Sequence, residues 1–167
     1  MEKLWSPWRS KYLESFKSDE DKTKCIFCQM LTLDPKENDN LLVDMGEHTF
    51  TVLNLYPYNN GHLMIVPKRH TNDFSGLTKE ELTECFEKLQ FAEKALRKVL
   101  NPHGFNIGAN IGRVAGAGIE DHIHFHIVPR WNGDSNFMPI IGDVKVISQD
   151  LAETKSKLLQ AYSEIKR

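Results

Sequence analysis

The sequence predicts an α+β fold, with an antiparallel sheet of about five strands, one long helix and a C-terminal helix. Three observations indicate this class: strand-like stretches outnumber helical ones, several strands follow one another in hairpin order, and one long amphipathic helix interrupts them. With 167 residues, 40% of them hydrophobic, the chain can bury one compact core, so we expect a single domain over 1–167.

Composition excludes several classes of protein. A net charge of -2 creates no long-range positive field that would attract DNA or a membrane surface. The first eight residues are interrupted by charge and by Pro7, so they provide neither a signal peptide nor a membrane span. Three cysteines are too few for a disulfide framework. We therefore expect a cytoplasmic protein that binds neither nucleic acid nor membrane.

The first part of the chain combines a short helix with three strands. Ser6 and Pro7 are typical of a helix start, and this helix with a charged linker makes up 1–24. Two strands at 41–43 and 48–55 form a hairpin. The run at 62–67 is almost wholly apolar, which indicates a strand buried on both faces at the centre of the sheet.

A long helix is expected over about 78–100. Thr78 and Glu81 form a capping box, and an apolar stripe follows at helical spacing: Leu82, Phe86, Leu89, Ala92, Leu96 and Val99. Phe91 lies off this stripe and is a candidate for a second contact face, such as a subunit interface. Further strands are expected at 105–111 and 144–147, before a C-terminal helix over 148–167 that Ser148 would cap.

The stretch 121–130 places three histidines at strand spacing. On a β-strand, His122, His124 and His126 project from one face, and the apolar residues between them project from the other. Each buried imidazole needs a hydrogen-bond partner, so packing alone explains the three poorly. Three interpretations fit the pattern. The histidines could simply satisfy their own hydrogen bonds at a polar edge of the sheet, they could bind a metal, or a neutral imidazole among them could act as a nucleophile.

A second pattern that can bind a metal or carry out chemistry is Cys25-Ile26-Phe27-Cys28. Two thiolates at this spacing can bind one zinc ion. A redox pair is the rival interpretation, but redox motifs of this form follow a strand, and none precedes this one. A pair of reduced, buried cysteines is the third alternative.

The alternating histidines followed by Ile127-Val128-Pro129-Arg130 resemble the signature of the histidine triad (HIT) superfamily of nucleotidyl hydrolases and transferases. The segment 131–139 is similar to an extension in a bacterial branch that includes diadenosine tetraphosphate phosphorylases. The resemblance runs from about Cys25 to the C-terminus, and Trp5 to Arg9 extend it to the start. It implies a HIT-like fold with a catalytic core at 25–147, a homodimer, and cleavage of a purine nucleotide or a dinucleoside polyphosphate at the α-phosphate.

The resemblance also implies roles for single residues. His124 would be the nucleophile and His126 a donor to phosphate oxygens, while His122 would serve both the triad and a structural zinc ion. The zinc ligands would be Cys25, Cys28, His70 and His122. The nucleotide would be bound by Asn54, Asn110, His126 and the backbone of Gly116, Ala117 and Gly118, although these glycines could also serve a tight strand connection alone. His62 lies where relatives carry a histidine before the strand, and it could equally be structural.

One departure from the family pattern concerns the leaving group. Many HIT hydrolases place Gln, Ser or Thr shortly before the triad, whereas this chain has Gly118-Ile119-Glu120-Asp121, so the donor to the leaving group is undefined. No residue that we can identify selects water or phosphate as the acceptor. Three alternatives therefore stay open: a non-catalytic purine-nucleotide-binding HIT domain, a nucleoside phosphoramidase, and a zinc hydrolase with the metal on the triad.

Overall fold

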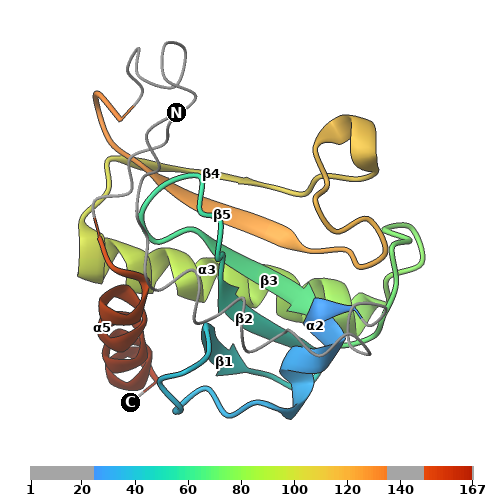
Figure 1. Cartoon of the computed structure of the whole chain (residues 1–167), viewed down its shortest axis with the longest axis horizontal. Coiled ribbons are helices and arrows are strands. Elements are labelled where there is room, and N and C mark those ends of the chain that lie inside the picture. The colour runs from blue at the N-terminus through green and yellow to red at the C-terminus, as the bar shows by residue number, and fades with distance from the viewer. Residues whose placement is uncertain (1–24, 135–148, 167) are drawn as a thin grey trace, which may run out of the picture.

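A computed structural model of the chain describes residues 25–134 and 149–166. Within these residues, five strands form one antiparallel sheet in the order β1-β2-β3-β5-β4, which confirms the predicted α+β class (Figure 1). The strands are β1 (Leu42–Met45), β2 (Thr49–Leu53), β3 (Leu63–Pro67), β4 (Gly104–Gly108) and β5 (Phe125–Arg130). The predicted N-terminal helix and linker, the strand at 144–147 and most of 131–139 lie outside the described residues.

The sheet is buried at its centre and exposed at one edge. Every residue of β2 and β3 is buried, as the apolar run at 62–67 predicts, and β1 and β2 form the expected hairpin. β3 pairs with β5 in a register that sets Met64 opposite His126. β4 forms the outer strand beside β5, and its last three residues are exposed.

The long helix α3 (Lys79–Leu100) confirms the prediction at 78–100, and both halves of the Thr78–Glu81 capping box are formed. It lies along one face of the sheet and ends at Asn101, which has a positive φ of 46° (Figure 1). The predicted stripe is wrong at one position, because Phe86 is 57% exposed whereas Cys85 is fully buried. The buried line is centred on Cys85, Leu89 and Ala92, so Phe86 lies at the rim of the helix face. No helix among the described residues is long and apolar enough to span a membrane.

The C-terminal helix α5 (Leu151–Ile165) begins at a different cap from the one predicted. Asp150, not Ser148, is the N-cap, because its carboxylate accepts hydrogen bonds from the first backbone amides of the helix. The ring of Tyr162 packs edge-on against Phe91 at 4.7 Å. Phe91 therefore does mark a second contact face of α3, which it forms with α5 of the same chain.

A short helix α2 (Ile26–Gln29), followed by the 3-10 turn η2 (Met30–Thr32), covers the face of the sheet opposite α3 (Figure 1). Phe27 anchors it: this side chain is 1% exposed and packs edge-on against Phe50 of β2, with ring centroids 6.3 Å apart. The helix thereby holds Cys25 and Cys28 against the end of the sheet that carries the triad.

The triad strand is shorter than predicted. β5 begins at Phe125, so His122 and His124 precede the strand and only His126 belongs to it. The ladder with β3 stops at the pair Ile65–Phe125, and the chain before it docks instead on the segment that follows β3. There the amide of Ile123 donates to the carbonyl oxygen of Thr71 at 2.7 Å. This docking keeps the alternating side-chain directions but replaces ladder hydrogen bonds with tertiary ones.

Candidate active site and metal-binding cluster

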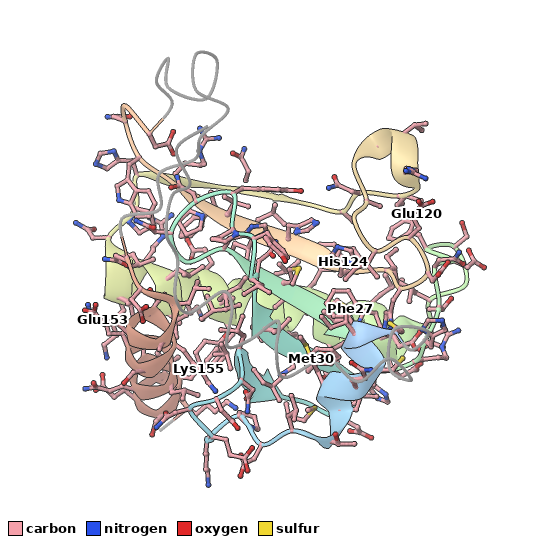
Figure 2. The ribbon with its side chains drawn as sticks, in the orientation of Figure 1. Phe27, Met30, Glu120, His124, Glu153 and Lys155 are labelled. Atoms are coloured by element: carbon pink, nitrogen blue, oxygen red, sulfur yellow. The ribbon has the colours of Figure 1, made fainter. Side chains whose placement is uncertain are left out.

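The three triad histidines lie together beneath α2. His122, His124 and His126 are only 0%, 5% and 7% exposed, and the rings of His124 and His126 lie 4.8 Å apart. Phe27 points from α2 toward the triad, with its ring 5.0 Å from that of His124 and 5.4 Å from that of His122 (Figure 2). The structure therefore brings the triad into one buried cluster, walled on one side by an aromatic ring.

The hydrogen bonds of His124 fix the position of its proton. Its Nδ1 lies 2.9 Å from the carbonyl oxygen of His122, and because a carbonyl only accepts, Nδ1 must carry the hydrogen. In the neutral imidazole, Nε2 then has the lone pair. Burial lowers the pKa of His124, although the hydrogen bond to His122 opposes this, so the neutral form is favoured. A neutral imidazole with a free Nε2 lone pair can act as a nucleophile.

The proton on His126 is set by His62, whose role the sequence leaves open. His62 is fully buried at the start of β3, and its Nδ1 accepts the backbone amide of Tyr58 at 3.0 Å. The hydrogen of His62 is therefore on Nε2, which lies 2.9 Å from Nδ1 of His126. It follows that His126 accepts at Nδ1 and carries its own hydrogen on Nε2. That Nε2 is buried and has no hydrogen-bond partner among the described residues, so it is a donor available to a bound anion.

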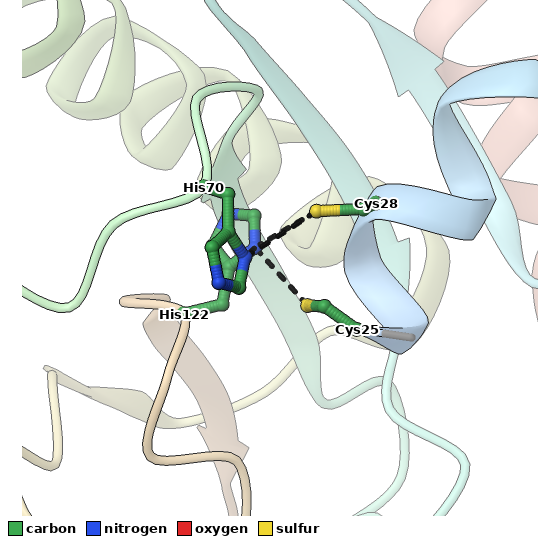
Figure 3. Close-up of side chains that lie close together, drawn as sticks. All are labelled: Cys25, Cys28, His70 and His122. Atoms are coloured by element: carbon green, nitrogen blue, oxygen red, sulfur yellow. Dashed lines mark hydrogen bonds between the residues drawn. The ribbon is translucent and has the colours of Figure 1, made fainter. Parts of the chain in front are cut away.

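A second cluster contains two cysteines and two histidines. The side chains of Cys25, Cys28, His70 and His122 face one another, and their ligand atoms all lie within 4.8 Å of one another (Figure 3). Nδ1 of His122 is 3.3 Å from Sγ of Cys25, 3.7 Å from Sγ of Cys28 and 3.3 Å from Nδ1 of His70. A tetrahedral zinc site has edges of about 3.4 Å between two nitrogens and about 3.6 Å between nitrogen and sulfur. The three distances from Nδ1 of His122 are therefore close to the edges of a tetrahedral zinc site.

The tautomer of His122 also suits a metal ligand. Its Nε2 lies 2.8 Å from the carbonyl oxygen of Pro67 and must donate to it, which leaves Nδ1 bare and directed at the cysteines. The cluster uses four protein ligands, the number typical of a closed structural site. This grouping argues against a zinc hydrolase with its metal on the triad, because only His122 of the triad belongs to the cluster.

Apart from His126 in β5, the predicted nucleotide-binding residues occupy two places. Asn54, directly after β2, accepts the amide of Tyr56 at its Oδ1, and its Nδ2 lies 3.3 Å from Nδ1 of His62. The others lie in the glycine-containing loop around η3 (Arg113–Ala115), which projects beyond the end of the sheet (Figure 1). There Asn110 donates to the oxygen of Gly116 at 3.4 Å, while the amides of Gly116 and Ala117 donate within the loop. In this conformation those two amides are already used, which the glycine pattern did not reveal.

Sequence reasoning missed the residues that support the triad. Phe27 lies between the two cysteines, and the Cys-x-x-Cys pattern alone does not reveal that its ring packs against His122 and His124. Tyr58, Asn59 and Asp134 were not selected either. Asn59 and Asp134 meet over 75 positions of the chain, and Tyr58 acts through its backbone amide, so the sequence provides no periodic signal for these roles.

Comparisons with known proteins agree with this geometry. Residues 35–133 match the HIT domain family. The chain is 42% identical over 166 residues to the AP-4-A phosphorylase of Mycobacterium tuberculosis, covering 98% of this chain and 85% of that enzyme. It is 31% identical over 110 residues to the adenosine 5'-monophosphoramidase hnt1 of Schizosaccharomyces pombe, covering 65% of this chain and 75% of that protein.

A solved structure shows the same arrangement of elements. The crystal structure of a Zn-bound histidine triad family protein from Mycobacterium smegmatis superposes with a TM-score of 0.68 at 26% identity, covering 86% of this chain and 96% of that one. The family match spans more than half of the chain, and the 42% identity extends over nearly all of it. The chain therefore belongs to the HIT domain family.

Proposed function

We propose that this HIT-family enzyme cleaves dinucleoside polyphosphates, such as diadenosine tetraphosphate, through a nucleotidyl intermediate on Nε2 of His124. The tautomer of His124 is the observation that carries the proposal. Its Nδ1 hydrogen is held by the carbonyl oxygen of His122, so the lone pair is on the opposite nitrogen. The 42% identity to an AP-4-A phosphorylase supports the substrate class.

The chemistry has two steps. Nε2 of His124 attacks the α-phosphorus, a nitrogen–phosphorus bond forms, and the bond to the bridging oxygen breaks with its electron pair passing to the departing polyphosphate. Water or inorganic phosphate then attacks the same phosphorus and releases the imidazole. Nε2–H of His126 donates to a phosphate oxygen, where negative charge develops in the transition state. Hydrolysis and phosphorolysis share the intermediate and differ only in the second step.

The substrate assay separates these outcomes. Incubation with diadenosine tetraphosphate in the absence of phosphate should release AMP and ATP, and a phosphorylase should form ADP and ATP when phosphate is added. Chromatography of the nucleotides reads both. If neither condition yields mononucleotides while AMP still binds, the chain is a non-catalytic nucleotide-binding domain and the proposal is wrong.

A nucleoside phosphoramidase is the second candidate, because the S. pombe relative is 31% identical over 110 residues. Adenosine phosphoramidate also presents an α-phosphorus to His124, but its leaving group is ammonia and it lacks a second nucleotide. The ratio of kcat/KM for the phosphoramidate and for diadenosine tetraphosphate decides between the two candidates. A higher value for the phosphoramidate would reverse our assignment.

The second cluster is proposed to hold one structural zinc ion, ligated by Cys25, Cys28, His70 and His122. The spacing of the ligand atoms supports this, as does the zinc-bound state of the M. smegmatis relative. When bound, zinc would cross-link α2 to the segments after β3 and before β5. Neighbouring hydrogen bonds hold the two histidine ligands in place. Nε2–H of His122 donates to the carbonyl oxygen of Pro67, and Arg69, next to His70, pairs with Glu81 at the start of α3.

Elemental analysis tests the zinc proposal. Protein purified without chelators should contain about one zinc per chain, and Cys28→Ser should lose it. Cys85→Ala is the matched control, because Cys85 is buried in α3 outside the cluster and should leave the metal content unchanged. Metal content that is unaffected by Cys28→Ser would contradict the assignment.

A further inference from the structure

The turn between β2 and β3 is held in place by residues far away in the chain. Nδ2 of Asn59 donates to the carboxylate of Asp134 at 2.8 Å and to the carbonyl oxygen of Pro129 at 3.2 Å. At the other end of the turn, Gly61 has a φ of 72° and backs onto the side chains of Leu96 and Leu100. The turn is therefore fixed both to the end of β5 and to α3.

Asp134 is the centre of this attachment, which we call the Asp134 clamp and define as Asn59, Arg130 and Asp134. The Asp134 side chain is only 10% exposed and accepts four hydrogen bonds from described residues. Two come from the guanidinium of Arg130 at 2.7 Å each, one from Asn59, and one from the amide of Trp131 at 3.0 Å. Arg130 also donates to Oδ1 of Asn106 in β4 at 2.7 Å. These donors fill the acceptor sites of the carboxylate, so it serves as a rigid anchor.

The clamp reaches the active site through two backbone amides. The carbonyl oxygen of Asn59 accepts the amide of His62 at 3.2 Å, and the amide of the preceding residue, Tyr58, donates to Nδ1 of His62 at 3.0 Å. The position of Asn59 therefore determines whether the Tyr58 amide, the closer of two donors, faces Nδ1 of His62; the other is Nδ2 of Asn54 at 3.3 Å. As long as the Tyr58 amide does so, the hydrogen of His62 must remain on Nε2, and that hydrogen is directed at His126.

Loss of this donor would propagate to the phosphate site. A hydrogen that moved to Nδ1 of His62 would leave Nε2 bare, and His126 would then have to present a hydrogen on Nδ1 to satisfy it. Nε2 of His126 would become a lone pair facing the phosphate. A donor to the developing negative charge would be replaced by an acceptor that repels it.

We infer that Asp134, Arg130 and Asn59 are positioning residues, which fix the imidazole tautomers of His62 and His126 from outside the active site. The consequence for catalysis rests on the proposed function, whereas the tautomers themselves do not depend on it. Residues 130–134 thereby gain a defined role: through Asn59 they order the donor side of the triad.

Long-range proton–nitrogen NMR of the imidazole rings, on the metal-replete protein without substrate, tests the inference directly. Wild-type protein should show both His62 and His126 with the hydrogen on Nε2. Asn59→Ala, which leaves the Arg130–Asp134 ion pair intact, should give mixed tautomers for both rings. Glu153→Gln is the matched control, because it removes the charge from another i,i+4 ion pair, with Lys157, on α5, and its spectrum should be that of wild type.

Two further variants keep the test decisive if one of them folds poorly. Asp134→Ala should reproduce the mixed tautomers. Because Asn59→Ala and Asp134→Ala break the same Asn59–Asp134 hydrogen bond, the double variant should show the same proportion of tautomers as either single variant. Asp134→Asn retains an acceptor oxygen for Asn59 and should largely restore the wild-type spectrum. Folded Asn59→Ala or Asp134→Ala protein with wild-type tautomers would overturn the inference, as would a wild-type His62 that carries its hydrogen on Nδ1.

Kinetics separates this inference from the proposed function. With diadenosine tetraphosphate, Asn59→Ala should lower kcat by about ten- to a hundred-fold, because His126 no longer offers a donor to the charge that develops in the transition state. If wild-type protein does not cleave nucleotides but the tautomers shift as expected, the proposed function is wrong and the positioning role holds. If cleavage occurs and the variants leave both tautomers and kcat unchanged, the positioning role is wrong.

Discussion

At the scale of single residues, His126 shows how burial keeps an imidazole neutral. Its ring is 7% exposed, and desolvation, assisted by the nearby His124, lowers the pKa of His126 to about 4. It is therefore neutral at physiological pH, and its Nε2 hydrogen is kept in place by the hydrogen bond from His62 and not by a positive charge. A neutral donor can bind the substrate without creating a buried ion when the substrate leaves.

This lowered pKa predicts how stability depends on pH. Between pH of about 6.5, the value for an unfolded histidine, and pH of about 4, the unfolded chain binds a proton at His126 that the folded chain does not. The free energy of unfolding should therefore fall as the pH falls through this window, by at most about 3 kcal/mol from this group. Urea denaturation at pH 7 and pH 5 measures the change, and His126→Asn should show a smaller decrease than wild type. Equal decreases in both proteins would remove His126 as the source.

Sequence reasoning succeeded for residues whose neighbours are set by local periodicity. The spacing of His122, His124 and His126 was enough to predict that they gather, and the structure also brings Cys25 and Cys28 together with His70 and His122. The sequence pattern could not predict which nitrogen of each imidazole ring carries the hydrogen. Those positions depend on the carbonyl oxygen of His122 and the amide of Tyr58. Every residue has such backbone groups, so the sequence does not show which of them bond to a side chain.

At the scale of secondary-structure elements, the turn between β2 and β3 is the most constrained connection near the site. Gly61 has a φ of 72°, and a Cβ at this position would lie 2.4 Å from Cδ1 of Leu100. Gly61→Ala should therefore lower the free energy of unfolding by about 1–3 kcal/mol. Gly104→Ala is the matched control, because a Cβ there would meet nothing within 4 Å, so its effect should stay within about 0.5 kcal/mol. Thermal or urea unfolding compares the two, and equal stabilities would contradict the argument.

The elements differ in how well the sequence specifies them. α3 has a capping box at one end and a left-handed residue at the other, so its bounds were predicted to within one residue. β5 was predicted several residues too long, because its first half retains the strand pattern although its hydrogen bonds go to the segment after β3. Side-chain alternation records direction, whereas the partner of each backbone amide is decided by tertiary contacts.

At the scale of the whole molecule, β4 and α3 present a surface suited to a second copy of the chain. β4 is an edge strand with exposed backbone groups, and Ile107 and Phe86 beside it are 53% and 57% exposed. They line a pocket of about 290 Å³ together with Leu89, Gln90, Glu93 and Lys94. An unprotected edge next to apolar side chains is typical of a pairing surface. This surface adds to the family resemblance as a reason to expect a homodimer.

The oligomeric state can be measured by light scattering. We expect twice the chain mass of 19.2 kDa for the wild type, since two-fold dimers are the commonest soluble assembly. Ile107→Lys should shift the mass toward the monomer by placing a charge in the interface. Leu31→Lys, which alters an exposed apolar residue of η2 on the opposite side of the sheet, should leave the dimer intact. A wild-type protein that stays monomeric at high concentration would exclude this assembly.

The sheet carries two clusters at one end, the histidine triad and the metal-binding cluster, and His122 belongs to both. In the proposed mechanism, the metal cluster would hold the segment before β5 against α2, and the triad would direct the bare Nε2 of His124 and the Nε2–H of His126 toward one phosphate. In this mechanism His124 is the nucleophile and His126 is only a hydrogen-bond donor. Loss of His124 should abolish turnover, while loss of one donor at His126 should cost about 10²–10³ in rate.

Rapid quenching with an α-labelled dinucleoside tetraphosphate tests this division most directly. Wild-type protein and His126→Ala should both trap label covalently on the chain, with an acid-labile bond that peptide mapping assigns to His124. His124→Asn should trap none and should still bind AMP. Turnover by His124→Asn at the wild-type rate, or the absence of protein-bound nucleotide in wild type while substrate is being consumed, would contradict the mechanism.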